Sequence, residues 1–218
     1  LENRGNGTLV ADHNINITAS YLMTDAGSQI AAGSDAMLFV MNNLDNSGDI
    51  RAAHDINLNV MGSYGWSQST AYNYGTMTAG NKLNAQMDRV NLINGGTLSA
   101  DNGITLVSNY LTNSGNITSA SDITLNTASG INNEASGNIT GDRVYTTGYV
   151  NNMGIINETG AATTDNGATT PDNGATTPDD SNTNPDSDAT EDNRGNTTVK
   201  TNGTPEGNGV WENGVVYN

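Results

Sequence analysis

The chain lacks cysteine and is poor in aromatic and basic residues. Its 218 residues include no Cys, one Phe, two Trp, and only seven Lys or Arg against 23 Asp or Glu. Without cysteine, neither disulfide bonds nor cysteine-ligated metal sites are open to it. Its formal net charge of −16 is a poor electrostatic match for nucleic acid or an anionic membrane surface. No apolar run is long enough to cross a bilayer, so we expect no membrane insertion.

What the chain has is a repeat. A pentapeptide of the form apolar-x-Asn-x-Gly occurs as LENRG (1–5), LDNSG (44–48), LINGG (92–96), LTNSG (111–115) and VNNMG (150–154). The copies are separated by about twenty residues or a multiple of that, which is typical of repeat architectures. Polar and apolar residues alternate between the copies, as in Ile56-Asn57-Leu58-Asn59. This alternation predicts short, half-buried strands, and no window predicts a long helix.

The repeat predicts an all-β chain wound as a right-handed parallel β-helix. We expect a solenoid of about eight rungs over residues 1–157, each with about 20 residues and three short strands. The recurring Asn should stack as a hydrogen-bonded amide ladder, and the following Gly should supply the positive φ of a tight corner. The predicted ladder consists of Asn3, Asn46, Asn94, Asn113, Asn133 and Asn152. A β-sandwich would explain the strand density equally well, but not the constant offset of Asn and Gly from the apolar position.

The composition changes near residue 157. Residues 158–209 contain almost no aliphatic side chains, hold all four prolines, and are predicted to form an acidic, disordered spacer. Residues 210–217 predict a short β-hairpin around Asn213-Gly214, with Trp211 opposite Val216. Since the chain starts in mid-repeat without Met or a signal peptide, we expect it to be the C-terminal piece of a longer protein.

Three segments resemble the haemagglutinin repeats of the filamentous haemagglutinin family. They are LENRGNGTLVADHNINITA (1–19), LINGGTLSADNGITLVS (92–108) and LTNSGNITSASDITLNT (111–127). The resemblance implies a large secreted or surface-exposed bacterial protein, exported by an outer-membrane transporter of two-partner secretion. It further implies a non-catalytic, β-helical shaft segment of an adhesin that mediates cell attachment. The alternative within the family is the stalk of a contact-dependent growth inhibition effector, although the chain has no VENN-type junction or toxin-like domain.

One rung is longer than the others. From Ile50 to Met77 the chain runs 27 residues, and the excess is assigned to an inserted loop at 61–75, MGSYGWSQSTAYNYG. Insertions in solenoids often form the binding surface, and aromatic rings offer flat faces to sugars or proteins. The predicted contact residues for a host or neighbouring-cell surface glycan or protein are Tyr64, Trp66, Tyr72 and Tyr74. The alternative is a loop that folds its own aromatic rings onto the shaft.

The sequence offers little catalytic or metal-binding chemistry. Aspartates recur near the predicted corners at Asp12, Asp35, Asp55, Asp101, Asp122 and Asp142. Such residues cap turns more often than they bind Ca²⁺, and His13 and His54 lie two rungs apart, too far to share a metal. Since known catalytic motifs are missing, we expect no cofactor, no metal and no enzymatic activity. The remaining alternative is a β-helical polysaccharide-degrading enzyme, with stacked corner aspartates as its paired acids.

Overall fold

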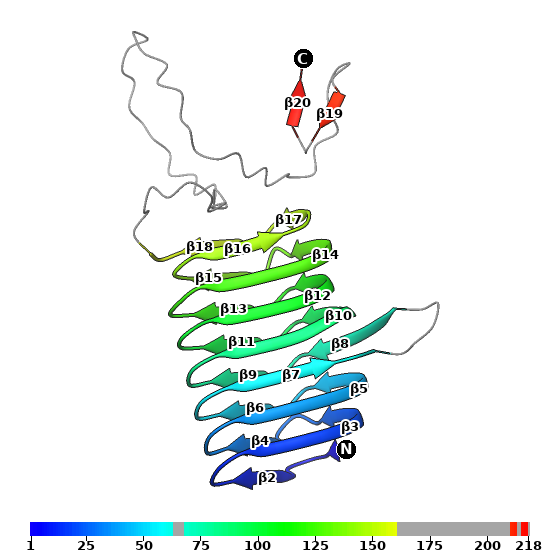
Figure 1. Ribbon diagram of the computed structural model, residues 1–218, viewed down its shortest axis with the longest axis vertical. Coiled ribbons are helices and arrows are strands. Elements are labelled where there is room, and N and C mark those ends of the chain that lie inside the picture. The colour runs from blue at the N-terminus through cyan, green and yellow to red at the C-terminus, as the bar shows by residue number, and fades with distance from the viewer. Residues whose placement is uncertain (63–67, 161–209, 213–214, 218) are drawn as a thin grey trace.

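The computed structural model describes residues 1–62, 68–160, 210–212 and 215–217. Within these residues the chain forms twenty β-strands and no helix. Strands 1 to 18 wind into a parallel β-solenoid of about seven turns, with β1 and β2 at one end and β16 to β18 at the other (Figure 1). The prediction of a parallel β-helix is therefore confirmed, with about one turn fewer than expected.

Two parallel sheets form the walls of the solenoid, and we call them the long sheet and the short sheet. The long sheet contains β1 (Glu2–Asn3), β3 (Ile15–Thr24), β5 (Ala36–Asn46), β7 (Ile56–Val60), β8 (Ser69–Asn73), β10 (Leu83–Asn94), β12 (Ile104–Asn113), β14 (Ile123–Asn133), β16 (Val144–Thr147) and β17 (Val150–Asn152). The short sheet contains β2 (Thr8–Ala11), β4 (Gln29–Ala32), β6 (Asp49–Ala52), β9 (Thr76–Ala79), β11 (Thr97–Ala100), β13 (Asn116–Ser119), β15 (Asn138–Gly141) and β18 (Ile155–Glu158).

Most rungs contain one short and one long strand rather than three short ones. In β5, for example, the buried residues Ala36 and Leu44 lie on a single strand of 11 residues. The pairing of β3 with β5 shifts register between Ala19 and Tyr21, and β10, β12 and β14 shift at the equivalent place. We call this irregular point the bend. It divides each long strand into the two segments that the sequence pattern indicates.

Apolar side chains from both sheets fill the interior in columns. In the short sheet, one column runs through paired residues on consecutive rungs. Its buried members, at most 2% exposed, are Ile30, Ile50, Met77, Leu98, Ile117, Ile139 and Ile156. Burial of one such side chain contributes roughly 1.5–3 kcal/mol to the hydrophobic free energy of folding. The apolar residues of the alternating sequence thus pack on those of the rungs on either side and stabilise the solenoid.

The glycines of the pentapeptide have a different role from the one predicted. Of the five, only Gly5 has a positive φ. Gly96 and Gly115 lie where adjacent rungs come closest: a Cβ atom on Gly96 would be 2.0 Å from the carbonyl oxygen of Gly75, and one on Gly115 would be 2.1 Å from that of Gly96. The positive-φ prediction is therefore wrong for most copies. Glycine is needed at Gly96 and Gly115 because a side chain would collide with the preceding rung.

Beyond the solenoid, β19 (Val210–Glu212) and β20 (Val215–Tyr217) pair antiparallel, with Trp211 opposite Val216. Residues 161–209, most of the predicted spacer, and the predicted turn at 213–214 lie outside the described residues. No helix long and apolar enough to cross a membrane occurs in the described part of the chain.

Candidate functional site

The insertion is shorter than predicted. Residues 69–73 form β8, which pairs with β10 from Ser69 opposite Val90 to Asn73 opposite Asn94. They are therefore part of the long sheet and not of a loop. The extra chain is confined to 61–68, at the bend, where β10 has only residues 88–89 between the corresponding positions.

Two of the four predicted contact residues lie together beside this insertion. Tyr72 in β8 is half-buried, and Tyr74, just after β8, is 56% exposed. Their rings stack with centroids 5.9 Å apart and an interplanar angle of 19°. The ring of Tyr74 lies close to Gly95, where a Cβ atom would be 2.8 Å from Tyr74 Cδ1. Tyr64 and Trp66 lie outside the described residues.

The amide ladder runs through the interior next to this surface. Each of Asn46, Asn73, Asn94, Asn113 and Asn133 donates from Nδ2 to Oδ1 of the next ladder asparagine, ending at Asn152, over 2.7–2.8 Å. Five of the six predicted asparagines belong to it. Asn3 does not, because Thr24 occupies the position opposite it, and Asn3 donates instead to the Gln29 carbonyl at 3.0 Å. The Thr24 hydroxyl then donates to Asn46 Oδ1.

Asn73 is the ladder member that the sequence analysis missed. Its pentapeptide, Ala71-Tyr72-Asn73-Tyr74-Gly75, has the same offsets as the others, but alanine occupies the apolar position. Ala71 is fully buried and lies opposite Leu92, so it does serve as the anchor. In the sequence, only the Asn-x-Gly spacing could have identified Asn73 as a member of the ladder.

The ladder is fully satisfied and therefore structural. Its five donor asparagines are 0% exposed. The Nδ2 group of Asn73 also donates to the Thr97 carbonyl at 3.2 Å, and that of Asn94 to the Asn116 carbonyl at 3.2 Å. Buried amides need such partners, because an unpaired one costs about 1–3 kcal/mol.

The predicted corner aspartates do not form one column. Backbone hydrogen bonds between rungs place Asp35 and Asp55 on adjacent turns, with Lys82 in the same position of the next turn. His13 and His54 are separated by Ser34, which bonds to both backbones. The two histidines therefore lie two rungs apart, as their spacing in the sequence predicts.

One titratable cluster forms at this corner. Ligand atoms of Asp35, His54 and Asp55 lie within 4.8 Å of one another. His54 Nδ1 is 3.1 Å from Asp35 Oδ1, which also accepts from the Asp55 backbone N–H at 3.1 Å. Asp55 Oδ1 accepts from Asn81 Nδ2 at 2.6 Å and from the Lys82 backbone N–H at 3.1 Å. These oxygens accept hydrogen bonds from the following rung and not from their own turn, so they connect corners of adjacent rungs where the sequence analysis expected local turn caps.

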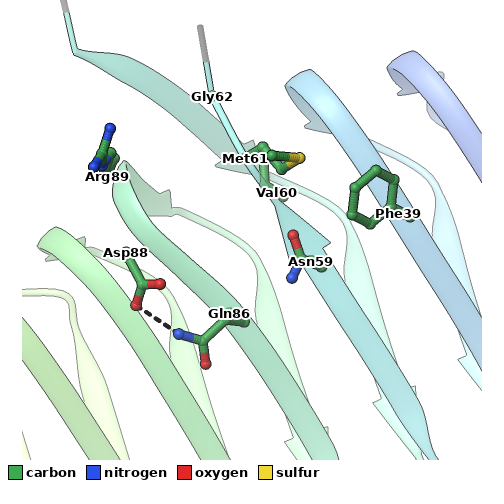
Figure 2. Close-up of a pocket in the computed structure, with 8 residues that line it drawn as sticks. All are labelled: Phe39, Asn59, Val60, Met61, Gly62, Gln86, Asp88 and Arg89. Atoms are coloured by element: carbon green, nitrogen blue, oxygen red, sulfur yellow. Dashed lines mark hydrogen bonds between the residues drawn. The ribbon is translucent and has the colours of Figure 1, made fainter. Parts of the chain in front are cut away.

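A pocket of about 340 Å³ opens on the outer face of the long sheet, at the base of the insertion. It is lined by Phe39, Asn59, Val60, Met61, Gly62, Gln86, Asp88 and Arg89 (Figure 2). Gly62, the second residue of the insertion, has a φ of +72°, and a Cβ atom there would be 2.8 Å from Val90 Cγ2. Apolar side chains on the outer face here, 37% to 43% exposed, are Met37, Phe39, Met41 and Met61.

Polar side chains at the bend hold the C-terminal end of the insertion. Asn109 Nδ2 donates to Gln68 Oε1 at 3.1 Å and to Asn91 Oδ1 at 2.8 Å. Ser129 Oγ donates to Asn109 Oδ1 at 3.1 Å. Gln68, at the C-terminal end of the insertion, is thereby connected to a rung two turns further along the solenoid.

The basic side chains of the solenoid are scattered. Arg4 pairs with Glu2 at 2.8 Å and Arg51 with Asp49 at 3.4 Å, both at the exposed surface. Arg143 donates to the Tyr145 hydroxyl at 3.5 Å, which raises the pKa of the guanidinium. Among the described residues, Lys82 is the basic residue on the rung next to the Asp35–His54–Asp55 cluster, at the position that corresponds to Asp55.

The fold and the ladder together define the chain as a parallel β-solenoid with one enlarged rung. Comparisons with protein-family models, curated proteins and solved structures find no match. The resemblance to haemagglutinin repeats therefore depends on the residue pattern alone.

Proposed function

We propose that residues 1–157 are a non-catalytic shaft segment of a large, secreted or surface-exposed bacterial adhesin that mediates cell attachment. The observation that supports this is a parallel solenoid with one enlarged rung, beside which the exposed Tyr74 stacks on the half-buried Tyr72. The full-length protein is exported by an outer-membrane transporter of two-partner secretion, as the family resemblance implies.

A shaft needs length and stiffness along one axis. Consecutive rungs in a parallel β-solenoid are about 4.8 Å apart, so seven turns extend over on the order of 30 Å. The apolar columns and the amide ladder both run along that axis and connect every rung to the next. Such an arrangement holds an attached surface at a fixed distance and orientation.

The contact surface is the aromatic region at the enlarged rung. Tyr72 and Tyr74 present two nearly parallel rings, and Tyr74 is largely exposed. Aromatic faces bind sugar rings or apolar protein surface, while the hydroxyl groups orient the partner. The partner is a glycan or protein on the surface of a host or neighbouring cell.

Attachment of the purified chain to cultured host cells and to neighbouring bacteria tests this proposal. We expect Tyr72→Ala, Tyr74→Ala and Trp66→Ala each to weaken attachment several-fold while the far-UV β-sheet spectrum is retained. Tyr149→Ala, which removes a 52% exposed tyrosine on a distant rung, is the matched control and should attach normally. Undiminished attachment of all three variants would remove the aromatic region from the proposal.

The second candidate is the stalk of a contact-dependent growth inhibition effector, which needs the same shaft but no contact site of its own. In that case the purified chain attaches to no cell, and the gene encodes a downstream toxin domain followed by a small immunity gene. The Asp35–His54–Asp55 cluster motivates the third candidate, a polysaccharide-degrading enzyme. Release of oligosaccharides from acidic or neutral polysaccharides, abolished by Asp35→Asn, would favour it over the adhesin.

A further inference from the structure

Outward-facing side chains line up across three rungs beside the insertion. Phe39 of β5 lies directly opposite Asn59 of β7, and Asn59 lies opposite Gln86 of β10. Figure 2 shows the three side chains following one another across adjacent strands. They form a line parallel to the solenoid axis on the outer face of the long sheet.

A second column of outward side chains runs next to the first. Asn57 lies opposite Asn84, and Asn84 opposite Thr105. These residues line a shallower hollow of about 220 Å³, which shares Asn59 and Gln86 with the pocket described above. The two hollows are thus continuous. We call the surface formed by Phe39, Asn57, Asn59, Asn84 and Gln86 the amide groove.

The groove offers paired donors and acceptors. A side-chain amide presents one N–H₂ donor and one carbonyl acceptor in a plane, which matches two neighbouring hydroxyl groups of a sugar. Asn84 Nδ2 donates to Asn57 Oδ1 at 3.0 Å and Gln86 Nε2 donates to Asp88 Oδ1 at 2.5 Å, so these side chains are oriented. Asn59 makes no hydrogen bond to another described residue, so its amide is available to a ligand.

Apolar surface lies at one end of the line of amides. The ring of Phe39 is 37% exposed, and Met61 lines the same pocket. A sugar ring has an apolar face of C–H groups that packs on such a surface, while its hydroxyls point sideways to polar groups. The order along the axis, an aromatic ring and then two amides, fits a chain of rings rather than a single one.

The charge at the groove favours a neutral ligand. Among the described residues, Asp88 and Arg89 are the charged side chains that line the adjoining pocket, and their charges cancel. Arg89 forms no ion pair with any described residue, so its guanidinium is free to donate to hydroxyl groups. The net charge of −16 repels polyanions such as sulfated or uronic acid polymers.

We propose that the amide groove binds an extended, neutral polysaccharide chain that lies parallel to the shaft. The distance between rungs, about 4.8 Å, is close to the length of one sugar ring in an extended chain. Consecutive rings then lie over Phe39, Asn59 and Gln86, with Asp88 and Arg89 contacting hydroxyls at the side. This assignment rests on the proposed adhesive function and specifies its ligand class.

Isothermal titration calorimetry on the complete chain tests whether the amide groove binds a neutral polysaccharide. The neutral probes are β-1,4-linked hexasaccharides of glucose, mannose and N-acetylglucosamine, and the acidic probes are hexagalacturonate and a heparin hexasaccharide. We expect binding of at least one neutral probe, weakened roughly tenfold by Phe39→Ala and by Gln86→Ala, because each removes a direct contact. Asn126→Ala is the matched control: Asn126 lies in the same outward column, two rungs beyond Gln86, and its loss should leave the affinity unchanged.

Three results would overturn the assignment: no neutral probe binds, an acidic probe binds more tightly, or both groove variants keep the wild-type affinity. Circular dichroism of each variant verifies that the solenoid is folded. The cell-attachment assay separates this proposal from the proposed function. Attachment that depends on Tyr72 and Tyr74 but occurs without affinity for neutral sugars would reject the groove and retain the adhesin.

Discussion

Asn73 donates its side-chain N–H to Oδ1 of Asn94 over 2.7 Å, and both residues are completely buried. This hydrogen bond connects the enlarged rung to the next one. The rung between Ile50 and Met77 therefore keeps the same interior as the regular rungs, although the chain is longer there. The ladder therefore continues unbroken through this rung, from Asn46 through Asn73 to Asn94.

Removal of one interior ladder amide should destabilise the solenoid. We expect Asn94→Ala to lower the free energy of unfolding by about 1–3 kcal/mol, because it leaves Asn113 Oδ1 without its donor and removes the acceptor of Asn73. Urea denaturation followed by circular dichroism measures the change. Asn152→Ala at the end of the ladder removes one bond only and should cost less. Equal losses in the two variants would contradict a continuous ladder.

A methyl group at the closest contact between rungs should also destabilise the fold. In Gly115→Ala the new Cβ atom would be 2.1 Å from the Gly96 carbonyl oxygen, so the rungs must move apart. Overpacking of this kind typically costs about 1–3 kcal/mol. Thermal unfolding of Gly115→Ala next to Ser114→Ala, its neighbour at the same corner, gives the comparison. A melting temperature equal to that of Ser114→Ala would show that the close contact between the two rungs does not determine stability.

Replacement of the insertion by a regular bend should leave the solenoid stable. When residues 61–68 are exchanged for Asp-Arg, the pair found at the bend of the next rung, β7 and β8 remain in register with β10. We expect an unchanged thermal midpoint and weaker cell attachment, because Tyr64 and Trp66 are removed. Deletion of residues 69–73 serves as the opposite control and should unfold the chain, since it removes β8. A large loss of stability on replacing 61–68 would place those residues in the coil.

The aspartates at the corner should contribute to stability rather than to metal binding. Asp55→Ala removes the acceptor of Asn81 and of the Lys82 backbone N–H, so we expect a loss of about 1 kcal/mol. Asp101→Ala is the control, because the Asp101 side chain forms no hydrogen bond to a described residue. Melting curves with EDTA, Zn²⁺ or Ca²⁺ should coincide for the wild type. Stabilisation by Zn²⁺ in the wild type but not in Asp55→Ala would instead establish a metal site.

The fold was predictable because its main determinants are local. Alternation at Ile56–Val60 and the fixed offset of Asn from its apolar anchor specify strands and their stacking without long-range information. The position of β8 was not predictable in the same way. Ala71 is smaller than the leucine or valine found at this position in the other copies, and the additional residues of the rung conceal which residues pair with β10. The role of Gly96 depends on a neighbouring rung, which the pattern within one repeat does not contain.

The candidate site was only partly visible in the sequence. Tyr72 and Tyr74 lie close together in the chain, and their clustering was evident. Phe39, Asn59 and Gln86 are separated by 20 and 27 residues and meet only once the exact register is known. The one signal in the sequence was the run Met37, Phe39, Met41, in which apolar residues occupy positions that face outward.

The register shifts occur at equivalent places: Ser20 against 41–42 between β3 and β5, and Asn109 against 128–129 between β12 and β14. Chain length varies there without disturbing the interior hydrogen bonds. Peptides grafted at several of these points would form a row along one edge of the rod, one per turn. Such a row would act as a multivalent display scaffold whose ligand spacing is set by the protein backbone itself.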